Sequence, residues 1–113
     1  MTEPNDFYCL HSDMCKTLAS EKRQRIIGAL REGGLTVSEM QERTGIAQAN
    51  LSQHLAVLRT KGVVATTREG TRVRYTLTNP KILQAFDLIS EVMAESLADR
   101  KDLVDEAVGR GQD

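Results

Sequence analysis

Residues 46–59 read IAQANLSQHLAVLR, and this stretch decides the fold. Its residues Leu51, Leu55 and Leu58 recur at the i, i+4, i+7 spacing of one helical face, which predicts that this face packs on a core. The opposite face carries Ala49, Ser52, Gln53 and Ala56. An ordinary surface helix carries Lys and Glu there, so this neutral face predicts a helix that enters a groove and exchanges hydrogen bonds.

The preceding residues predict a partner for this helix. Thr36 is followed three residues later by Glu39, which is a capping-box pattern. In this pattern the Thr36 hydroxyl accepts from the Glu39 amide, and the Glu39 carboxylate accepts from the Thr36 amide. Gly45 then ends a short helix. We therefore expect residues 36–60 to form a helix-turn-helix. Three apolar residues can pack its helices together: Val37, Met40 and Ile46.

Two further helices are expected before this unit. The first spans Phe7 to Ala19 and has an apolar stripe formed by Phe7, Leu10, Met14 and Leu18. Ser20 is the expected N-cap of the second, which runs from Glu21 to about Glu32 and ends before Gly33 and Gly34. The side chains of this second helix that should face the core are Ile26, Ile27 and Leu30.

A β-hairpin is expected after Gly62, where the character of the sequence changes. The segments 63–68 and 71–77 are rich in Val and Thr, and Glu69-Gly70 separates them. This pattern predicts two antiparallel strands joined by a tight turn, which would form a wing over residues 63–77.

Three arginines lie on the expected wing: Arg68, Arg72 and Arg74. Their shared residue parity predicts that they lie largely on one face unless a bulge intervenes. Charged residues can simply decorate an exposed hairpin. Beside a helix-turn-helix, however, cations are typical of phosphate or minor-groove contacts, because they neutralise backbone charge.

A long helix is expected to close the sequence, with Asn79 as its N-cap and Pro80 at its first position. Its apolar stripe is Ile82, Phe86, Ile89, Met93 and Leu97. We interpret residues 1–19 and 79–108 as dimerisation helices, because such a stripe exceeds what one small domain needs; the alternative is an intramolecular core. The sequence leaves open whether Leu103, Val104 and Val108 continue this helix.

The chain as a whole is expected to form one domain, since it has 113 residues. Its net charge of -1 excludes a histone-like polycation, although cations prevail between Arg59 and Lys81 and acids prevail after Asp87. The sequence shows neither a signal peptide nor a membrane span, so we expect a cytoplasmic protein with no membrane partner. No Ser/His/Asp set, phosphate loop or paired carboxylates indicate an enzyme.

The order of these elements resembles the ArsR/SmtB family of small dimeric winged helix-turn-helix repressors. Three segments carry the resemblance: MCKTLASEKRQRIIGAL at 14–30, LTVSEMQERTGIAQANLSQHLAVLRTKGVV at 35–64 and REGTRVRYTL at 68–77. It implies a mainly α fold with a two-stranded β-wing, a homodimer formed by the first and last helices, and binding to a pseudo-palindromic double-stranded operator. Departures from the family pattern are Glu21, Gln24 and Ala47.

The resemblance also assigns DNA contacts. It places four residues in the part of the recognition helix that meets the major groove: Gln48, Asn50, Ser52 and Gln53. It places Arg72 and Arg74 on the wing. Geometry favours Ser52 and Gln53 as base readers, since a Gln amide can bond adenine bidentately and Ser can bond a base or a phosphate. His54 lies at the edge of the apolar stripe, and we expect it to be packed and hydrogen-bonded.

Members of this family are released from DNA by a metal, a metalloid or a thiol oxidant. The family's usual ligands are missing here, since there is no cysteine near Thr36 and no histidine in the final helix. Cys9, His11 and Cys15 remain as candidates for a metal, metalloid or redox site. His11 and Cys15 share a helical face, whereas Cys9 is about 9 Å along the axis from Cys15 if the helix is intact.

Three interpretations of these side chains remain open at this point. Cys15 can be a small packed hydrophobe, the thiols can ligate a metal or metalloid, or they can act as a redox switch.

A different kind of function also remains possible for the whole chain. The alternative is a winged-helix architectural or protein-interaction module without an effector site.

Overall fold

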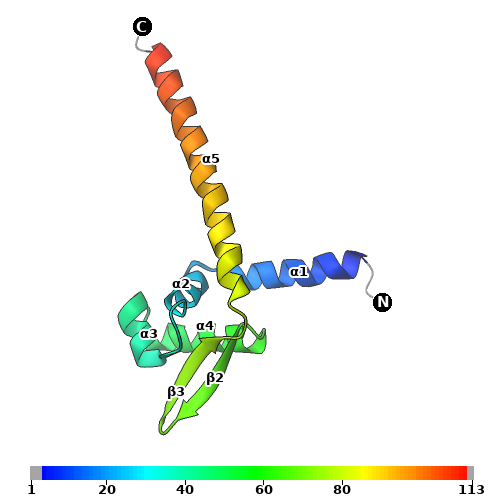
Figure 1. Ribbon diagram of the computed structural model, residues 1–113, viewed down its shortest axis with the longest axis vertical. Helices are drawn as coiled ribbons and strands as arrows, with labels where there is room; N and C mark the ends of the chain where they lie inside the picture. Colours follow the sequence, from blue (N-terminus) through cyan, green and yellow to red (C-terminus); the bar gives the residue numbers. More distant parts are fainter. Residues whose placement is uncertain (1–3, 112–113) are drawn as a thin grey trace. The chain divides into compact units, whose positions relative to one another are not determined.

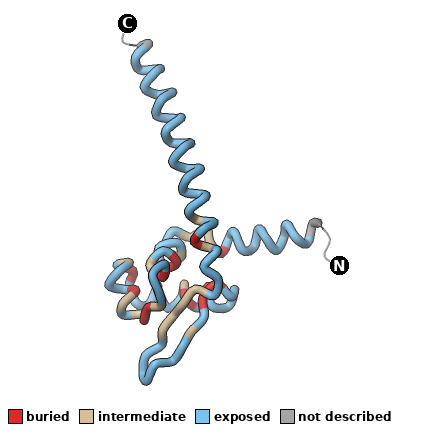
Figure 2. Tube along the Cα trace, in the orientation of Figure 1, coloured by how far each residue is buried: buried red, intermediate tan, exposed pale blue. Residues whose placement is uncertain are grey.

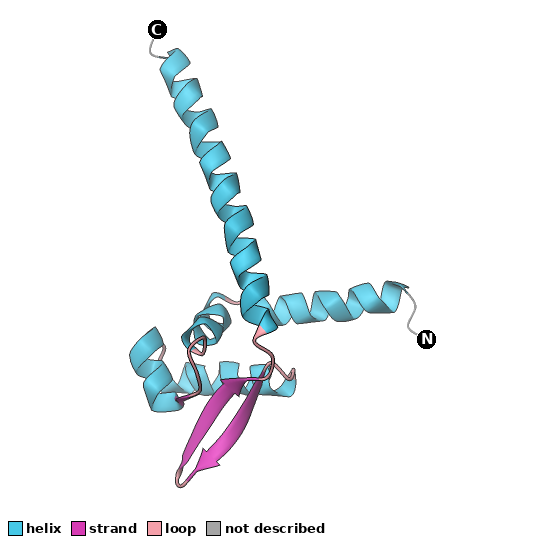
Figure 3. Cartoon of the chain, in the orientation of Figure 1, coloured by secondary structure: helices cyan, strands magenta, loops and turns pink. Residues whose placement is uncertain are grey.

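The computed structural model describes residues 4–111, with side chains described for residues 6–109. The elements are α1 (Pro4–Leu18), α2 (Glu21–Ala29), β1 (Leu35–Thr36), α3 (Val37–Thr44), α4 (Gln48–Thr60), β2 (Val64–Glu69), β3 (Arg72–Leu77) and α5 (Lys81–Gly111), as Figures 1 and 3 show. This order confirms the predicted mainly helical winged helix-turn-helix. The chain forms two compact units, one up to Pro80 and one from Lys81 onward.

Local hydrogen bonds fix the helix ends in the first unit. The Ser20 hydroxyl accepts from the Arg23 amide at 3.4 Å, as an N-cap does. At α3 the capping box is complete, because Thr36 Oγ1 accepts from the Glu39 amide and the Glu39 carboxylate accepts from the Thr36 amide. Gly45 ends α3 in the left-handed region at φ 72°, where the absence of a Cβ removes the steric penalty.

Some predicted helix boundaries were wrong by one to three residues. α1 begins at Pro4, before Phe7, and ends at Leu18; residues 1–3 of the predicted dimerisation segment 1–19 lie outside the described part of the chain. α2 ends at Ala29, not at Glu32, because the Leu30 amide already bonds the carbonyls of Ile26 and Ile27 in a tightened last turn.

The predicted two-stranded wing is confirmed, and its sheet gains a third, short strand. β2 and β3 form the expected antiparallel hairpin, and Gly70 at φ 62° occupies its two-residue turn. The short strand β1 pairs with the other edge of β3, which gives a three-stranded sheet in the order β1-β3-β2. A strand of two residues has no alternation to detect, so the sequence did not predict β1.

The core of the first unit lies between α2, α3, α4 and the sheet (Figure 2). The predicted stripe of α4 is fully buried, with Leu51, Leu55 and Leu58 at most 1% exposed. The other buried apolar side chains of this unit are Ile26, Ile27, Leu30, Leu35, Met40, Ile46, Val63 and Val64. Burying one face of α4 leaves the opposite face in solvent.

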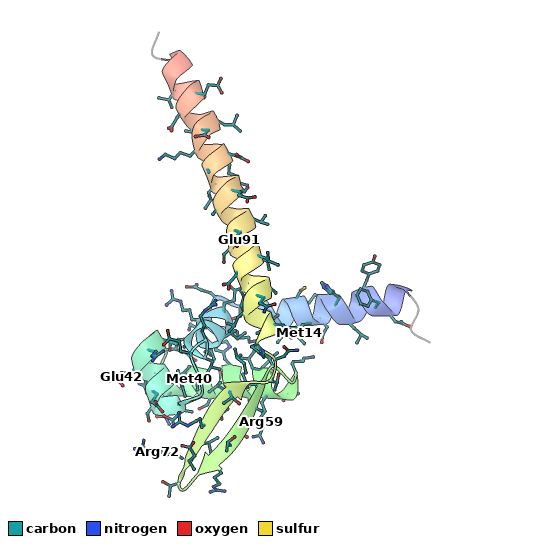
Figure 4. The ribbon with its side chains drawn as sticks, in the orientation of Figure 1. Met14, Met40, Glu42, Arg59, Arg72 and Glu91 are labelled. Atoms are coloured by element: carbon teal, nitrogen blue, oxygen red, sulfur yellow. The ribbon has the colours of Figure 1, made fainter. Side chains whose placement is uncertain are left out.

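The helices at the two ends of the chain expose apolar side chains. On α1 these are Phe7, Tyr8, Leu10 and Met14 (Met14 is labelled in Figure 4). On α5 they include Leu88, Ile89, Val92, Met93, Leu97, Leu103, Val104 and Val108. α5 is one continuous helix from Lys81, so it begins one residue after the predicted first position at Pro80, and Val108 belongs to it. Within the described residues, no helix is long and apolar enough to cross a membrane.

Candidate nucleic-acid interface

The exposed face of α4 carries the predicted base-reading residues. Gln48, Asn50, Ser52 and Gln53 are all exposed. Ala47 is the N-cap of α4 and makes no side-chain capping bond, so the first amides of the helix are open to an acceptor from outside. No acidic residue lies in the first turn. This end of α4 therefore suits the approach of a polyanion.

A shallow hollow of about 490 Å³ lies between α4 and strand β3 of the wing. Its walls are Ser52, Leu55, Ala56, Arg59 and Thr60 from α4 and Tyr75 from β3. Ser52 thus faces the wing side of α4. The hollow offers hydroxyl groups and one cation, which are groups that bond phosphate. Sequence reasoning missed Arg59, Thr60 and Tyr75 as candidate contacts; the arginine at the end of the recognition helix was the one available signal.

Arg68 does not share a face with Arg72 and Arg74, so the prediction of one common face was wrong for Arg68. In an antiparallel pair, directly opposed residues point to the same side of the sheet. Arg72 opposes Glu69 and Arg74 opposes Thr67, whereas Arg68 opposes Val73. Across this two-residue turn, each even-numbered residue of one strand opposes an odd-numbered residue of the other. An even-numbered residue on β2 and an even-numbered residue on β3 therefore lie on opposite faces. Arg68 therefore lies on the face that also carries Tyr75, which borders α4.

Arg72 and Arg74 lie on the other face of the wing but differ in their surroundings. Arg72 is exposed and projects from β3 on the side of α3 (Figure 4). Arg74 is half-buried and makes internal bonds, with Nε donating to Glu69 Oε1 at 2.9 Å and Nη1 donating to the Gly34 carbonyl at 2.8 Å. Of these two residues, Arg72 is the one with a solvent-directed charge.

His54 is packed and hydrogen-bonded, as expected. Its Nδ1 accepts a hydrogen bond from Arg23 Nε at 3.3 Å, while Arg23 Nη1 donates to the Thr17 carbonyl at 3.2 Å. Burial lowers the pKa of His54, and the charges of Arg23 and Lys22 lower it further. His54 therefore supports α4 from behind its DNA-facing side.

The side chains of the candidate effector site lie on α1. His11 Nδ1 is 3.6 Å from Cys15 Sγ on the exposed surface of the helix. Cys9 is also an exposed free thiol, and the helix is intact around it, so it is about 9 Å along the axis from Cys15 and beyond disulfide reach within one chain. Among the described residues, no group of three His, Cys, Asp or Glu side chains is arranged to hold a metal.

The fold and the exposed face of α4 define a class of protein, the winged helix-turn-helix DNA-binding transcriptional regulators. A helix-turn-helix domain family matches residues 18–67. The regulator Rv0081 of Mycobacterium tuberculosis is 37% identical over 87% of each chain, and its crystal structure superposes with a TM-score of 0.77, covering 88% of this chain and 98% of that one. The chain therefore belongs to the ArsR-type family of helix-turn-helix transcriptional regulators, and not to an enzyme family.

Two other relatives show the range of the family. The transcriptional activator HlyU of Vibrio cholerae is 34% identical over 74% of this chain and 77% of its own. A homodimeric winged helix-turn-helix domain from Mycobacterium bovis, described as a possible ArsR-family regulator, superposes with a TM-score of 0.73 at 26% identity, covering 86% of this chain and 91% of that one.

Proposed function

We propose that this protein is a homodimeric repressor that binds a pseudo-palindromic operator in the cytoplasm. The observation that carries the proposal is the composition of α4, whose buried leucine stripe is opposed by an exposed face of small, amide and hydroxyl groups. Such a face can approach base edges closely without desolvating charges of its own. The two recognition helices of a two-fold dimer would then read two half-sites one helical turn apart.

Each candidate contact has a role set by its position. Gln53 points away from the leucine stripe and offers a bidentate amide for adenine, with Gln48 and Asn50 beside it near the start of α4. Ser52, Arg59 and Tyr75 border the hollow between α4 and the wing, where a phosphate backbone would run. Arg68 and Arg72 extend the cationic surface along the wing. Phosphate contacts orient the protein, and the amides supply specificity.

The dimer would be formed by α1 and α5. Both helices expose apolar side chains along most of their lengths, and large exposed apolar surfaces are uncommon in monomeric proteins. The α5 stripe of Phe86, Ile89, Met93 and Leu97 continues to Val104 at spacings of three, four, four and seven residues. A second copy of the chain offers the same stripe, so pairing two copies is the simplest way to cover the stripe of each.

The experiment is a selection of bound duplexes from a random pool, followed by affinity measurements on the selected site. We expect a two-fold symmetric site, two chains per duplex, and affinity that falls steeply with salt. We also expect the selected site to bind at least about 10³ times tighter than shuffled DNA. Equal affinity for all sequences would instead indicate an architectural module.

We further propose that α1 carries the effector site. His11 lies beside Cys15 on an exposed helix surface, where the pair can ligate a soft metal or metalloid, or the free thiol can react with an oxidant. One chain offers two donors, so a metal would take its remaining ligands from solvent or a second chain. Cys15→Ser should keep operator binding but abolish release by metal or oxidant, whereas an unchanged response would contradict the proposal.

A further inference from the structure

Arg74 is the most heavily engaged cation of the wing. Its guanidinium meets three separate segments of the chain: Glu69 on β2, the Gly34 carbonyl before β1, and Glu39 on α3, whose Oε1 lies 3.6 Å from Arg74 Nη1. These partners are 5, 40 and 35 residues away in the sequence. One side chain therefore joins the hairpin to the loop before β1 and to α3.

The aliphatic part of the same side chain is tightly seated. A Cβ on Gly34 would lie 2.9 Å from Arg74 Cγ and 2.7 Å from Thr76 Cγ2, distances shorter than carbon atoms tolerate. Glycine at this position thus lets the loop lie directly against β3. The guanidinium itself is held by its hydrogen bonds to Glu69 and to the Gly34 carbonyl.

The acid that receives Arg74 on α3 also starts that helix. Glu39 Oε1 accepts from the Thr36 amide at 3.2 Å and from the Thr36 hydroxyl at 3.0 Å. Glu69 and Glu39 place two carboxylates around one guanidinium, which leaves no net positive charge there to attract a phosphate. Arg72, two residues earlier on the same strand face, is exposed.

We propose that Arg74 is a positioning residue that clamps the wing to the start of α3, and that it does not contact DNA. This inference rests on the proposed DNA-binding function. It gives different roles to the two arginines on one face of β3. Arg72 meets phosphate, while Arg74 sets the angle at which the hairpin leaves the helix-turn-helix. The wing then presents its exposed cations at a fixed distance from α4.

The test compares Arg74→Gln with the matched variant Arg72→Gln in the full chain, with operator affinity measured from about 0.05 to 0.4 M salt. A lost phosphate contact lowers the slope of log affinity against log salt by about 0.9 per subunit, and we expect this for Arg72→Gln. For Arg74→Gln we expect affinity to fall roughly three- to tenfold at every salt concentration with an unchanged slope. A slope change equal to that of Arg72→Gln would overturn the proposal.

A second measurement needs no DNA. Amide hydrogen exchange of β2 and β3 in the free protein should quicken roughly three- to tenfold in Arg74→Gln and stay at the wild-type rate in Arg72→Gln. Glu69→Gln should reproduce the faster exchange, and combining it with Arg74→Gln should add little. Equal exchange in the two arginine variants would refute the clamp. If the wild type preferred no duplex, the proposed function would be refuted. The hydrogen-exchange comparison would still test the clamp, because it uses the free protein.

Discussion

Arg23 Nε donates a hydrogen bond to His54 Nδ1 across 3.3 Å, which links α2 to the middle of the recognition helix. The acceptor role requires that Nδ1 carry no proton. Through its Nη1, Arg23 also holds the Thr17 carbonyl near the end of α1. Lys61 Nζ makes a second link from the end of α4 to α1, through Asp13 Oδ2 at 2.8 Å. The candidate dimer helix and the recognition helix are thus joined by polar contacts at two places.

The His54 contact predicts acid sensitivity of folding. Burial, with Arg23 and Lys22 beside it, lowers the pKa of His54 in the folded state, so the unfolded chain binds more protons near and below the ordinary value of about 6.5. The free energy of unfolding should therefore be highest above that pH and decrease as the pH falls through it. Urea unfolding between about pH 8 and pH 5, at fixed protein concentration, measures this.

The control for this titration is the other histidine of the chain, His11, which is exposed on α1. His54→Gln should flatten the part of the pH dependence near and below about pH 6.5, and His11→Gln should retain it. If both variants kept the wild-type profile, the dependence would come from another group and the Arg23 contact would not be its source.

Two glycines should respond in opposite directions to replacement by alanine. Gly34→Ala should lower the free energy of unfolding by about 1–3 kcal/mol, because its Cβ would overlap Thr76 and Arg74. Gly28→Ala should raise it by about 0.5–1 kcal/mol, because Gly28 lies in α2 with open space at the Cβ position and alanine favours a helix. Thermal or urea unfolding of both variants gives the two signs. The same sign for both would contradict the packing at Gly34.

Adjacent positions on α5 test the dimer face. Leu97 lies on the apolar stripe with 57% of its surface exposed, whereas Ala98 is one residue further and about 100° around the helix. Leu97→Asp should shift the protein from dimer to monomer, because it puts a charge into a desolvated seam. Ala98→Asp should leave the dimer intact. Sedimentation equilibrium of both variants distinguishes these outcomes, and a monomeric wild type would contradict the interface.

Local patterns explain why much of the fold was predictable from the sequence. The capping box of Thr36 and Glu39, the stop at Gly45 and the buried stripe of α4 each depend on residues within about one or two helical turns. The face of each wing arginine depends instead on the exact length of one turn. Equal parity places residues on one face only within a single strand, so extending the parity of Arg72 and Arg74 across the two-residue turn gave the wrong face for Arg68.

Contacts between distant residues explain what the sequence did not reveal. Arg74 bonds a carbonyl 40 residues away, and Arg23 bonds a histidine 31 residues away. Neither partner can be chosen from spacing, because both depend on how the helices and the sheet pack. The candidate contacts at Arg59 and Tyr75 also meet only after α4 and β3 come together around the hollow.

We expect α4 to read bases through Gln53, and paired selections of bound DNA test this role most directly. Wild type and Gln53→Ala would be selected against the same random pool, with Gln84→Ala on α5 as the matched control. We predict that Gln53→Ala loses preference at one symmetric pair of base positions and about 1–3 kcal/mol of discrimination at each, while Gln84→Ala selects the wild-type site. Identical selected sites for wild type and Gln53→Ala would contradict the claim.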